Sequence, residues 1–346
     1  MRILITGGAG FIGSNAAQHF LSRGHQVVIL DNLSRLGASR NLEWLRQLGH
    51  ELPFFRADVR DPSQVAAVFR EAGPFDVVLH LAAQVAVTTS VTDPREDFEV
   101  NSLGTFNLLE ASRIANPQPM FLYASTNKVY GAMDDVEVVE RNSRYEYKDL
   151  ATGVSESRQL DFHSPYGCSK GAADQYVIDY SRIYGLRTVS FRQSCIYGPR
   201  QFGVEDQGWV AWFCIAAVTG QPITIYGDGK QVRDVLYVED LLRVYDLAIE
   251  HITIASGKAY NVGGGPRHTL SLLELIAFLE KQLGRPLAHS FADWRPGDQR
   301  VYVSDVGRAH QELRWTPSIS AEEGLTKLQR WIQQNSALFE PTGAKP

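Results

Sequence analysis

The first 31 residues constrain the fold more than any other stretch of the chain. The pattern is strand, glycine-rich turn, helix and second strand, with the regular elements expected at residues 2–6, 14–23 and 26–30. The turn carries Gly7, Gly10 and Gly13. Glycine is required where a backbone turns tightly and approaches a pyrophosphate, and the helix that follows directs free N–H groups at the phosphates. This context predicts a dinucleotide site on a parallel α/β sheet.

The second strand ends at Asp31, whose carboxylate is expected to bind the adenosine ribose hydroxyls. A carboxylate repels a 2′-phosphate, which favours NAD over NADP, although the nearby Arg35 weakens that preference. Asp58 ends a third strand and is interpreted as a cofactor ligand, with capping of the following turn at Asp61 as the alternative. The other expected cofactor contacts are Phe11, Ile12, Asn32, Val59, Leu81, Ala82, Ala83 and Gln84.

The composition narrows the class of protein. The 346 residues are 44% hydrophobic and 21% charged, as in ordinary globular proteins, and a net charge of -5 gives no reason to expect a nucleic-acid partner. The spacing of the 3 cysteines fits neither a zinc site nor a disulfide framework, so no metal is expected. Without a signal peptide or a membrane-spanning run, the expected location is the cytoplasm, with no membrane association.

Alternating strands and helices continue beyond the first unit. Strands are expected at 54–58, 77–84, 120–124 and 188–192, and helices at 101–115 and 166–184. This alternation predicts an α/β fold: a Rossmann doubly wound parallel sheet with a smaller C-terminal α/β substrate domain. The expected NAD-binding domain is 1–191 with 231–261 returning, and the sugar-nucleotide domain is 192–230 and 262–346. Residues 223–229 are expected to form a hairpin.

Tyr166 and Lys170 stand four residues apart, which places them on one face of a helix. A nearby ammonium favours the phenolate, so this tyrosine can act as an acid or base closer to neutral pH. A Tyr and a Lys four residues apart occur often by chance, so their catalytic interpretation depends on the other motifs of the chain, one of which is Thr126. Thr126 follows the strand at 120–124, and it is expected on the same carboxyl rim of the sheet as Tyr166.

These features together resemble the extended short-chain dehydrogenases/reductases of the nucleotide-sugar epimerase and dehydratase group. The resemblance rests on the three glycines, Asp31, the Leu81-Ala82-Ala83 run, Thr126, and Tyr166 with Lys170. It implies that Thr126 hydrogen-bonds the reacting sugar oxygen and that Tyr166 is the acid/base. It also implies that Lys170 holds the nicotinamide ribose of NAD and lowers the pKa of the tyrosine.

The residues after Thr126 distinguish branches of this family. Family 4,6-dehydratases carry an Asp-Glu pair there, whereas this chain has Asn127 and Lys128, which cannot supply a paired acid and base at neutral pH. Whether these two side chains touch the substrate or only support the site stays open. The longer runs 125–131, 193–203, 206–213 and 229–236 resemble the CDP-paratose/CDP-tyvelose 2-epimerase branch.

The resemblance also implies two arginine anchors for a sugar nucleotide. Arg233 would grip the diphosphate, with a surface pair to Asp234 as the alternative, and Arg295 would hold phosphate with help from Asp298. The full set of expected substrate contacts is Thr126, Asn127, Lys128, Cys195, Gln201, Gln207, Arg233, Arg295 and Asp298.

Two segments remain ambiguous. The polar insertion 134–164, which ends near His163, is either a loop that covers the sugar or a surface excursion. His163 itself is either a second proton carrier or a hydrogen-bonding side chain. The helix from Tyr166 carries an apolar stripe that suits a homodimer interface or the protein core equally well.

The resulting expectation is NAD-dependent epimerisation at C2 of a nucleotide-diphosphate hexose through a transient 2-keto sugar. A CDP-hexose is favoured, and GDP- or UDP-sugars stay open. The alternatives are a UDP-hexose 4-epimerase, a net dehydrogenase and a non-catalytic NAD-binding scaffold; loss of Tyr166 or Lys170 would mark a scaffold, but both are present.

Overall fold

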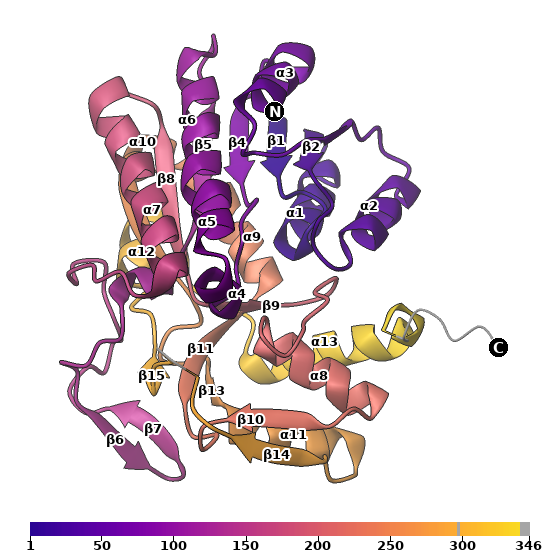
Figure 1. Ribbon diagram of the computed structural model, residues 1–346, viewed down its shortest axis with the longest axis vertical. Helices are drawn as coiled ribbons and strands as arrows, with labels where there is room; N and C mark the ends of the chain where they lie inside the picture. The colour runs from indigo at the N-terminus through magenta and orange to yellow at the C-terminus, as the bar shows by residue number, and fades with distance from the viewer. Residues whose placement is uncertain (296–297, 340–346) are drawn as a thin grey trace.

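A seven-stranded parallel sheet forms the centre of the computed structural model, which describes residues 1–295 and 298–339 (Figure 1). The strands lie in the order β12-β8-β5-β4-β1-β2-β3, so the sheet is doubly wound and the predicted Rossmann class is confirmed. Their bounds are β1 Arg2–Thr6, β2 Gln26–Asp31, β3 Phe54–Arg56, β4 Val77–His80, β5 Met120–Thr126, β8 Thr188–Gln193 and β12 Lys258–Val262.

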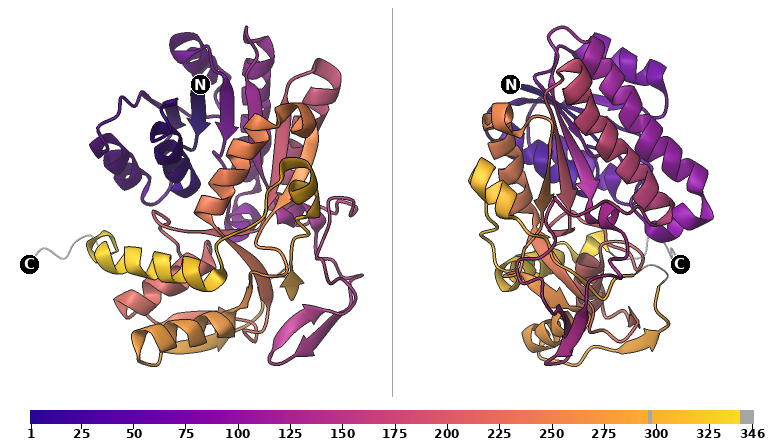
Figure 2. Two further views of the ribbon diagram at one scale, coloured as in Figure 1. Left: turned by 180° about the vertical axis from the view of Figure 1, so that it is seen from behind. Right: turned by 90° about the vertical axis from the view of Figure 1, so that its left-hand side faces the viewer.

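Helices cover both faces of this sheet (Figure 2). Ile3 and Ile5 of β1 pack with α1, α2 and α9, while Leu4 between them packs with α3, α6 and α7. Burial on both faces explains why these strands are continuous apolar runs. The bounds are α1 Phe11–Leu21, α2 Ala38–Gln47, α3 Pro62–Ala72, α4 Val87–Thr92, α5 Pro94–Phe98, η1 Glu99–Leu103, α6 Gly104–Ile114, η2 Asn127–Tyr130, α7 Ser164–Tyr184, α9 Val238–Glu250, α10 Ile252–Ala255 and α12 Gly307–Leu313.

The second unit lies beyond the carboxyl edge of the sheet, in the lower half of Figure 1. Its elements are β9 Cys195–Tyr197, α8 Trp209–Thr219, β10 Ile223–Tyr226, β11 Val232–Tyr237, β13 Thr269–Ser271, α11 Leu272–Leu283, β14 His289–Ala292, β15 Val301–Tyr302, α13 Ala321–Gln334 and η3 Ser336–Leu338. The hairpin expected at 223–229 is wrong, because β10 pairs in parallel with β14, far along the chain. β11 pairs with β9, β13 and β15, so the return to the main sheet is made by α9 and β12.

The insertion 134–164 contains a hairpin of β6 (Val138–Arg141) and β7 (Arg144–Tyr147). Arg144 pairs with Glu274 at 3.0 Å, and the Tyr145 hydroxyl donates to Asp228 at 2.6 Å, so the hairpin docks on the second unit. Of this insertion only His163 and Ser164 line the pocket described below, and the hairpin does not cover it. Across the described ranges no helix is both long and apolar enough to cross a membrane.

Candidate active site

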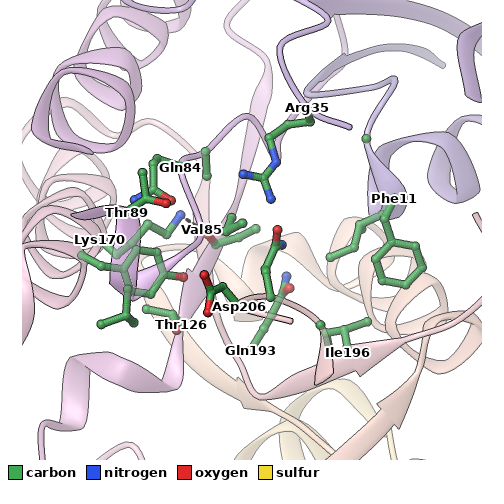
Figure 3. Close-up of a pocket in the computed structure, with 18 of the residues that line it drawn as sticks. Phe11, Arg35, Gln84, Val85, Thr89, Thr126, Lys170, Gln193, Ile196 and Asp206 are labelled. Carbon is green, nitrogen blue, oxygen red and sulfur yellow. Dashed lines mark hydrogen bonds between the residues drawn. The ribbon is translucent and has the colours of Figure 1, made fainter. Parts of the chain in front are cut away.

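A cavity of about 960 Å³ opens where the carboxyl ends of the sheet strands meet the second unit (Figure 3). Parallel strands end at one edge, and the register aligns Thr6 with His80 and Thr126 with Gln193. Lys170 and Thr126 lie on one side of the pocket, Phe11 and Ile196 on the other, and the Arg35 guanidinium points into the space between them. All the sequence-predicted site residues line this one cavity.

The glycine-rich turn is shaped to receive a pyrophosphate. Gly7 has φ +66°, which favours glycine, and a Cβ on Gly13 would lie 2.1 Å from the Gly7 carbonyl oxygen. Gly10 caps α1 without a side chain, so the first N–H groups of the helix have no side-chain acceptor. A dinucleotide phosphate fits this cradle, since it supplies the missing acceptors.

Two carboxylates line the part of the cavity where the adenosine is predicted to bind. Asp31 accepts the N–H groups of Ala9 at 3.0 Å and Leu33 at 2.7 Å, which fixes it at the end of β2; burial nevertheless raises its pKa. Asp58 accepts both Arg60, at 2.8 Å, and Asn32, at 3.0 Å. The Arg60 hydrogen bond is the main reason that the pKa of Asp58 falls to about 2.

Asp58 also caps the turn that leads to α3, as in the alternative interpretation, because its carboxylate accepts the Arg60 N–H at 3.0 Å and its carbonyl accepts the Asp61 N–H at 3.1 Å. Asp61 itself accepts the N–H groups of Ser63 at 2.8 Å and Gln64 at 3.3 Å. Gln84 lines the cavity, but its amide donates to Asp97 and to the Ala86 carbonyl, which commits the side chain to a buried network.

The proposed catalytic pair comes from α7. Lys170 donates to the Ala124 carbonyl at 2.6 Å and lies 4.3 Å from the Tyr123 ring centroid. Burial lowers the pKa of Lys170 to about 7, although Asp174 and Asp97 favour the charged form. The lysine is therefore held at the end of β5, within the cavity and beside the tyrosine.

The environment of Tyr166 differs from the expectation. Burial, reinforced by the Asp97 charge, raises the pKa of Tyr166 to about 12, while the Thr126 hydroxyl and the Arg35 guanidinium act in the opposite direction. The Lys170 amine donates to the Ala124 carbonyl, so its effect on the phenol stays a prediction, and Arg35 is a second cation whose charge acts in the same direction. From the sequence, Arg35 is expected only near the cofactor, where it affects the choice between NAD and NADP.

On the sugar side, Asp298 joins two cations. Arg233 is 7% exposed and donates to Asp298 and to the Gln299 carbonyl, both at 2.6 Å, while the Lys128 amine lies 4.0 Å from the same carboxylate. Burial, reinforced by the Arg233 charge, lowers the pKa of Lys128. The alternative Arg233–Asp234 surface pair is wrong. Asp234 is buried and accepts a hydrogen bond from Ser194, and successive residues of β11 point to opposite faces of the strand, so Arg233 points away from Asp234.

Arg295 is the second predicted anchor. It pairs with Asp206 at 2.9 Å and donates to the Glu205 carbonyl at 3.0 Å, with its guanidinium carbon 4.0 Å from the Tyr226 ring centroid. Pro296 and Gly297, which lie between Arg295 and Asp298, are outside the described residues, as is the tail 341–346, which its sequence predicts to be frayed. Cys195, whose thiol accepts from Trp209 at 3.4 Å, Gln201 and Gln207 complete this wall.

Sequence reasoning missed several lining residues. Gln193 ends β8 opposite Thr126, so the rule that located Thr126 also points to it. His163 pairs with Asp161 at 2.9 Å at the pocket rim, which supports the hydrogen-bonding reading of this side chain. The other missed lining residues include Val85, Thr89, Ser125, Asp206 and Tyr226.

The chain is similar in sequence and structure to enzymes that act on nucleotide sugars. The family model described as GDP-mannose 4,6 dehydratase matches residues 4–328. A CDP-paratose 2-epimerase of Salmonella typhi is 47% identical over 336 residues, covering 96% of this chain and 99% of that protein. A dTDP-glucose 4,6-dehydratase of Salmonella typhimurium is 33% identical, covering 97% and 94%. The Thermus thermophilus UDP-glucose 4-epimerase complex with NAD has a TM-score of 0.79 at 34% identity, covering 97% of this chain and 100% of that chain.

Proposed function

The chain belongs to the extended short-chain dehydrogenase/reductase family and is an NAD-dependent nucleotide-sugar epimerase, and on that premise we propose that it inverts C2 of a CDP-linked hexose. The observation that carries the proposal is the pairing of Thr126 and Tyr166 in one cavity with Asn127 and Lys128 beside them. The Salmonella typhi relative, named as acting on CDP-paratose at C2, supports both the carbon and the base.

The neighbours of Thr126 argue against dehydration, although the matching family model is named for dehydratases. Elimination of water needs an acid and a base placed together. An amide at Asn127 has no titratable proton, and Lys128 is held near Asp298 and Arg233. Without a paired acid and base next to Thr126, we expect the oxidised sugar to be reduced rather than dehydrated.

In the proposed mechanism Tyr166 removes the proton of the C2 hydroxyl, and Thr126 positions the same oxygen by a hydrogen bond. The glycine-rich turn and Asp31 would hold NAD, which would supply hydride transfer from and to the C2 carbon. Tyr166 then returns the proton. Arg233 and Arg295 keep the diphosphate in place while the ring turns, which is why separate anchors are needed.

The first prediction identifies the carbon. Deuterium at C2 of a CDP-hexose is expected to slow turnover by a primary isotope effect, since the C2 bond breaks, while deuterium at C4 leaves the rate unchanged. The measurement is kcat with each labelled substrate, with products from CDP-, GDP- and UDP-hexoses resolved by NMR. An isotope effect at C4 of a UDP-hexose would instead establish the 4-epimerase alternative, which the Thermus thermophilus relative represents.

The second prediction concerns the diphosphate anchor. Arg233→Gln is expected to raise KM roughly 10- to 100-fold with a smaller change in kcat, because charge-assisted hydrogen bonds contribute about 1.5–3 kcal/mol. The measurement is KM together with the Kd of CDP. Arg300→Gln, at an exposed arginine of the same unit outside the cavity, is the matched control. An unchanged Kd for CDP in Arg233→Gln would remove the arginine from the anchor.

We also propose a cytoplasmic homodimer paired through α6 and α7. These helices expose Phe106, Tyr176, Ile183 and Tyr184, each at least 40% accessible. Phe106 and Tyr176 lie 6.1 Å apart between ring centroids and form one apolar surface. The inward residues of the predicted stripe, Ala173, Val177 and Tyr180, pack in the core instead.

A further inference from the structure

Residues 199–203, here termed the clasp segment, cross between the two units above the glycine-rich turn. The Asn15 amide of α1 donates to the Pro199 carbonyl at 2.9 Å. The Asn41 amide of α2 donates to the Arg200 carbonyl and to the Ala9 carbonyl, each at 3.2 Å. One asparagine therefore ties the clasp segment directly to the turn that receives the pyrophosphate.

Arg200 joins the two units through aromatic faces. Its guanidinium carbon lies 4.1 Å from the ring centroid of Trp44 in α2 and 5.6 Å from that of Trp331 in α13. Within residues 1–295 and 298–339 no ion pair of Arg200 is seen, and the faces of the two indoles stabilise its charge. Arg200 also has φ +66°, a left-handed conformation that persists in a non-glycine residue only when its surroundings fix it.

Phe202 makes a second connection between the units. A Cβ on Gly37 would lie 2.0 Å from the Phe202 ring, so the ring lies directly against the start of α2. The same ring lies 5.5 Å from Phe339 between centroids. Arg40 of α2 donates to the Leu338 carbonyl, which fastens the end of the C-terminal helical segment to the nucleotide-binding unit.

The clasp segment forms part of the cofactor end of the cavity. Arg200 and Phe202 line it together with Gly10, Phe11 and Asn41. Asn41 is 1% exposed, and its side-chain oxygen is buried with no hydrogen-bond partner, which leaves an acceptor available beside the turn. These observations place a strained, multiply anchored wall over the site that the glycines form.

We infer that the clasp segment retains the cofactor: by locking α2 to α13 through Arg200 and Phe202, it slows dissociation of NAD from the protein. The need for retention follows from the chemistry of an epimerase. The cofactor is reduced and reoxidised in each turnover, and its loss between the two halves would leave the sugar at the ketone level. Arg200 and Phe202 are positioning residues in this proposal, and neither is assigned contact with the reacting atoms.

The test measures NAD dissociation without any sugar, so its outcome does not depend on the proposed reaction at C2. Holoenzyme is mixed with excess isotopically labelled NAD, and exchange of the bound cofactor is followed by mass spectrometry. Arg200→Gln removes the charge between the indoles, and Phe339→Ala removes a ring that lies outside the cavity lining. Each is expected to accelerate dissociation roughly tenfold.

Two further variants make the result specific. Phe291→Ala, at an exposed phenylalanine of β14 outside the cavity lining, is expected to keep the parent dissociation rate. Arg200→Lys keeps a cation between the indoles, and its NAD is expected to dissociate at a rate close to that of the parent protein. Parent-like dissociation in both Arg200→Gln and Phe339→Ala, or equal acceleration in Phe291→Ala, would overturn the inference.

Discussion

Tyr166→Phe is expected to lower kcat roughly 10²- to 10⁴-fold while the protein retains its NAD. The variant lacks the phenol that lines the cavity with Thr126 and whose ionised form the Arg35 charge favours. The ring itself stays, so packing at the start of α7 is preserved. The measurement is steady-state turnover of a CDP-hexose together with the molar ratio of bound NAD.

The matched control is Tyr176→Phe on the same helix, where the tyrosine is 52% exposed. It loses the same hydroxyl group and should keep parent turnover. Turnover in Tyr166→Phe within a factor of three of Tyr176→Phe would exclude the phenol as the proton carrier. Loss of bound NAD in Tyr166→Phe would show instead that the hydroxyl acts on cofactor binding.

The parts of the site that sequence predicts are those governed by short-range periodicity. Glycines at fixed positions between a strand and a helix locate the cofactor turn, and spacing on one helix places Tyr166 with Lys170. The rule that parallel strands end at one edge brings Thr126 to the same rim. The family resemblance predicts the residues that bind the sugar nucleotide. The structure brings three of them, Arg233, Arg295 and Asp298, into the same cavity.

What sequence could not predict depends on contacts between distant segments. The parallel pairing of β10 with β14 joins residues more than sixty positions apart, so a local turn pattern was misread as a hairpin. The influence of Arg35 on Tyr166 and the sharing of Asp298 by Lys128 and Arg233 likewise exist only in three dimensions. No local pattern encodes the balance of burial and charge that raises the pKa of a phenol.

Arg192→Met is expected to lower the free energy of unfolding by roughly 3–5 kcal/mol, the largest stability effect we predict for a single side chain. Arg192 of β8 and Asp174 of α7 form an ion pair at 2.9 Å, with side chains 5% and 0% exposed. Burial alone would raise the pKa of Asp174, but Arg192 and Ser190 outweigh it and the pKa is lowered. Removing the arginine leaves a buried carboxylate without its countercharge.

The measurement is urea unfolding at a fixed, saturating NAD concentration, with Lys327→Met as the control. Lys327 pairs with Glu323 at 3.1 Å on the surface of α13, and its loss should change the free energy of unfolding by less than about 1 kcal/mol. The double variant Asp174→Asn with Arg192→Met removes both charges and should be more stable than Arg192→Met alone. A loss in Arg192→Met no larger than in Lys327→Met would contradict the prediction.

The same pair connects stability to the site. Asp174 lies one helical turn after Lys170, and its charge favours the protonated lysine against the effect of burial. The double variant should therefore recover stability but still lack the Asp174 charge that favours protonated Lys170. The pKa of Lys170 should then fall below its value in the parent protein. A double variant that regains stability but still turns over more slowly at neutral pH would separate the two contributions of Asp174, one to the fold and one to the charge beside Tyr166.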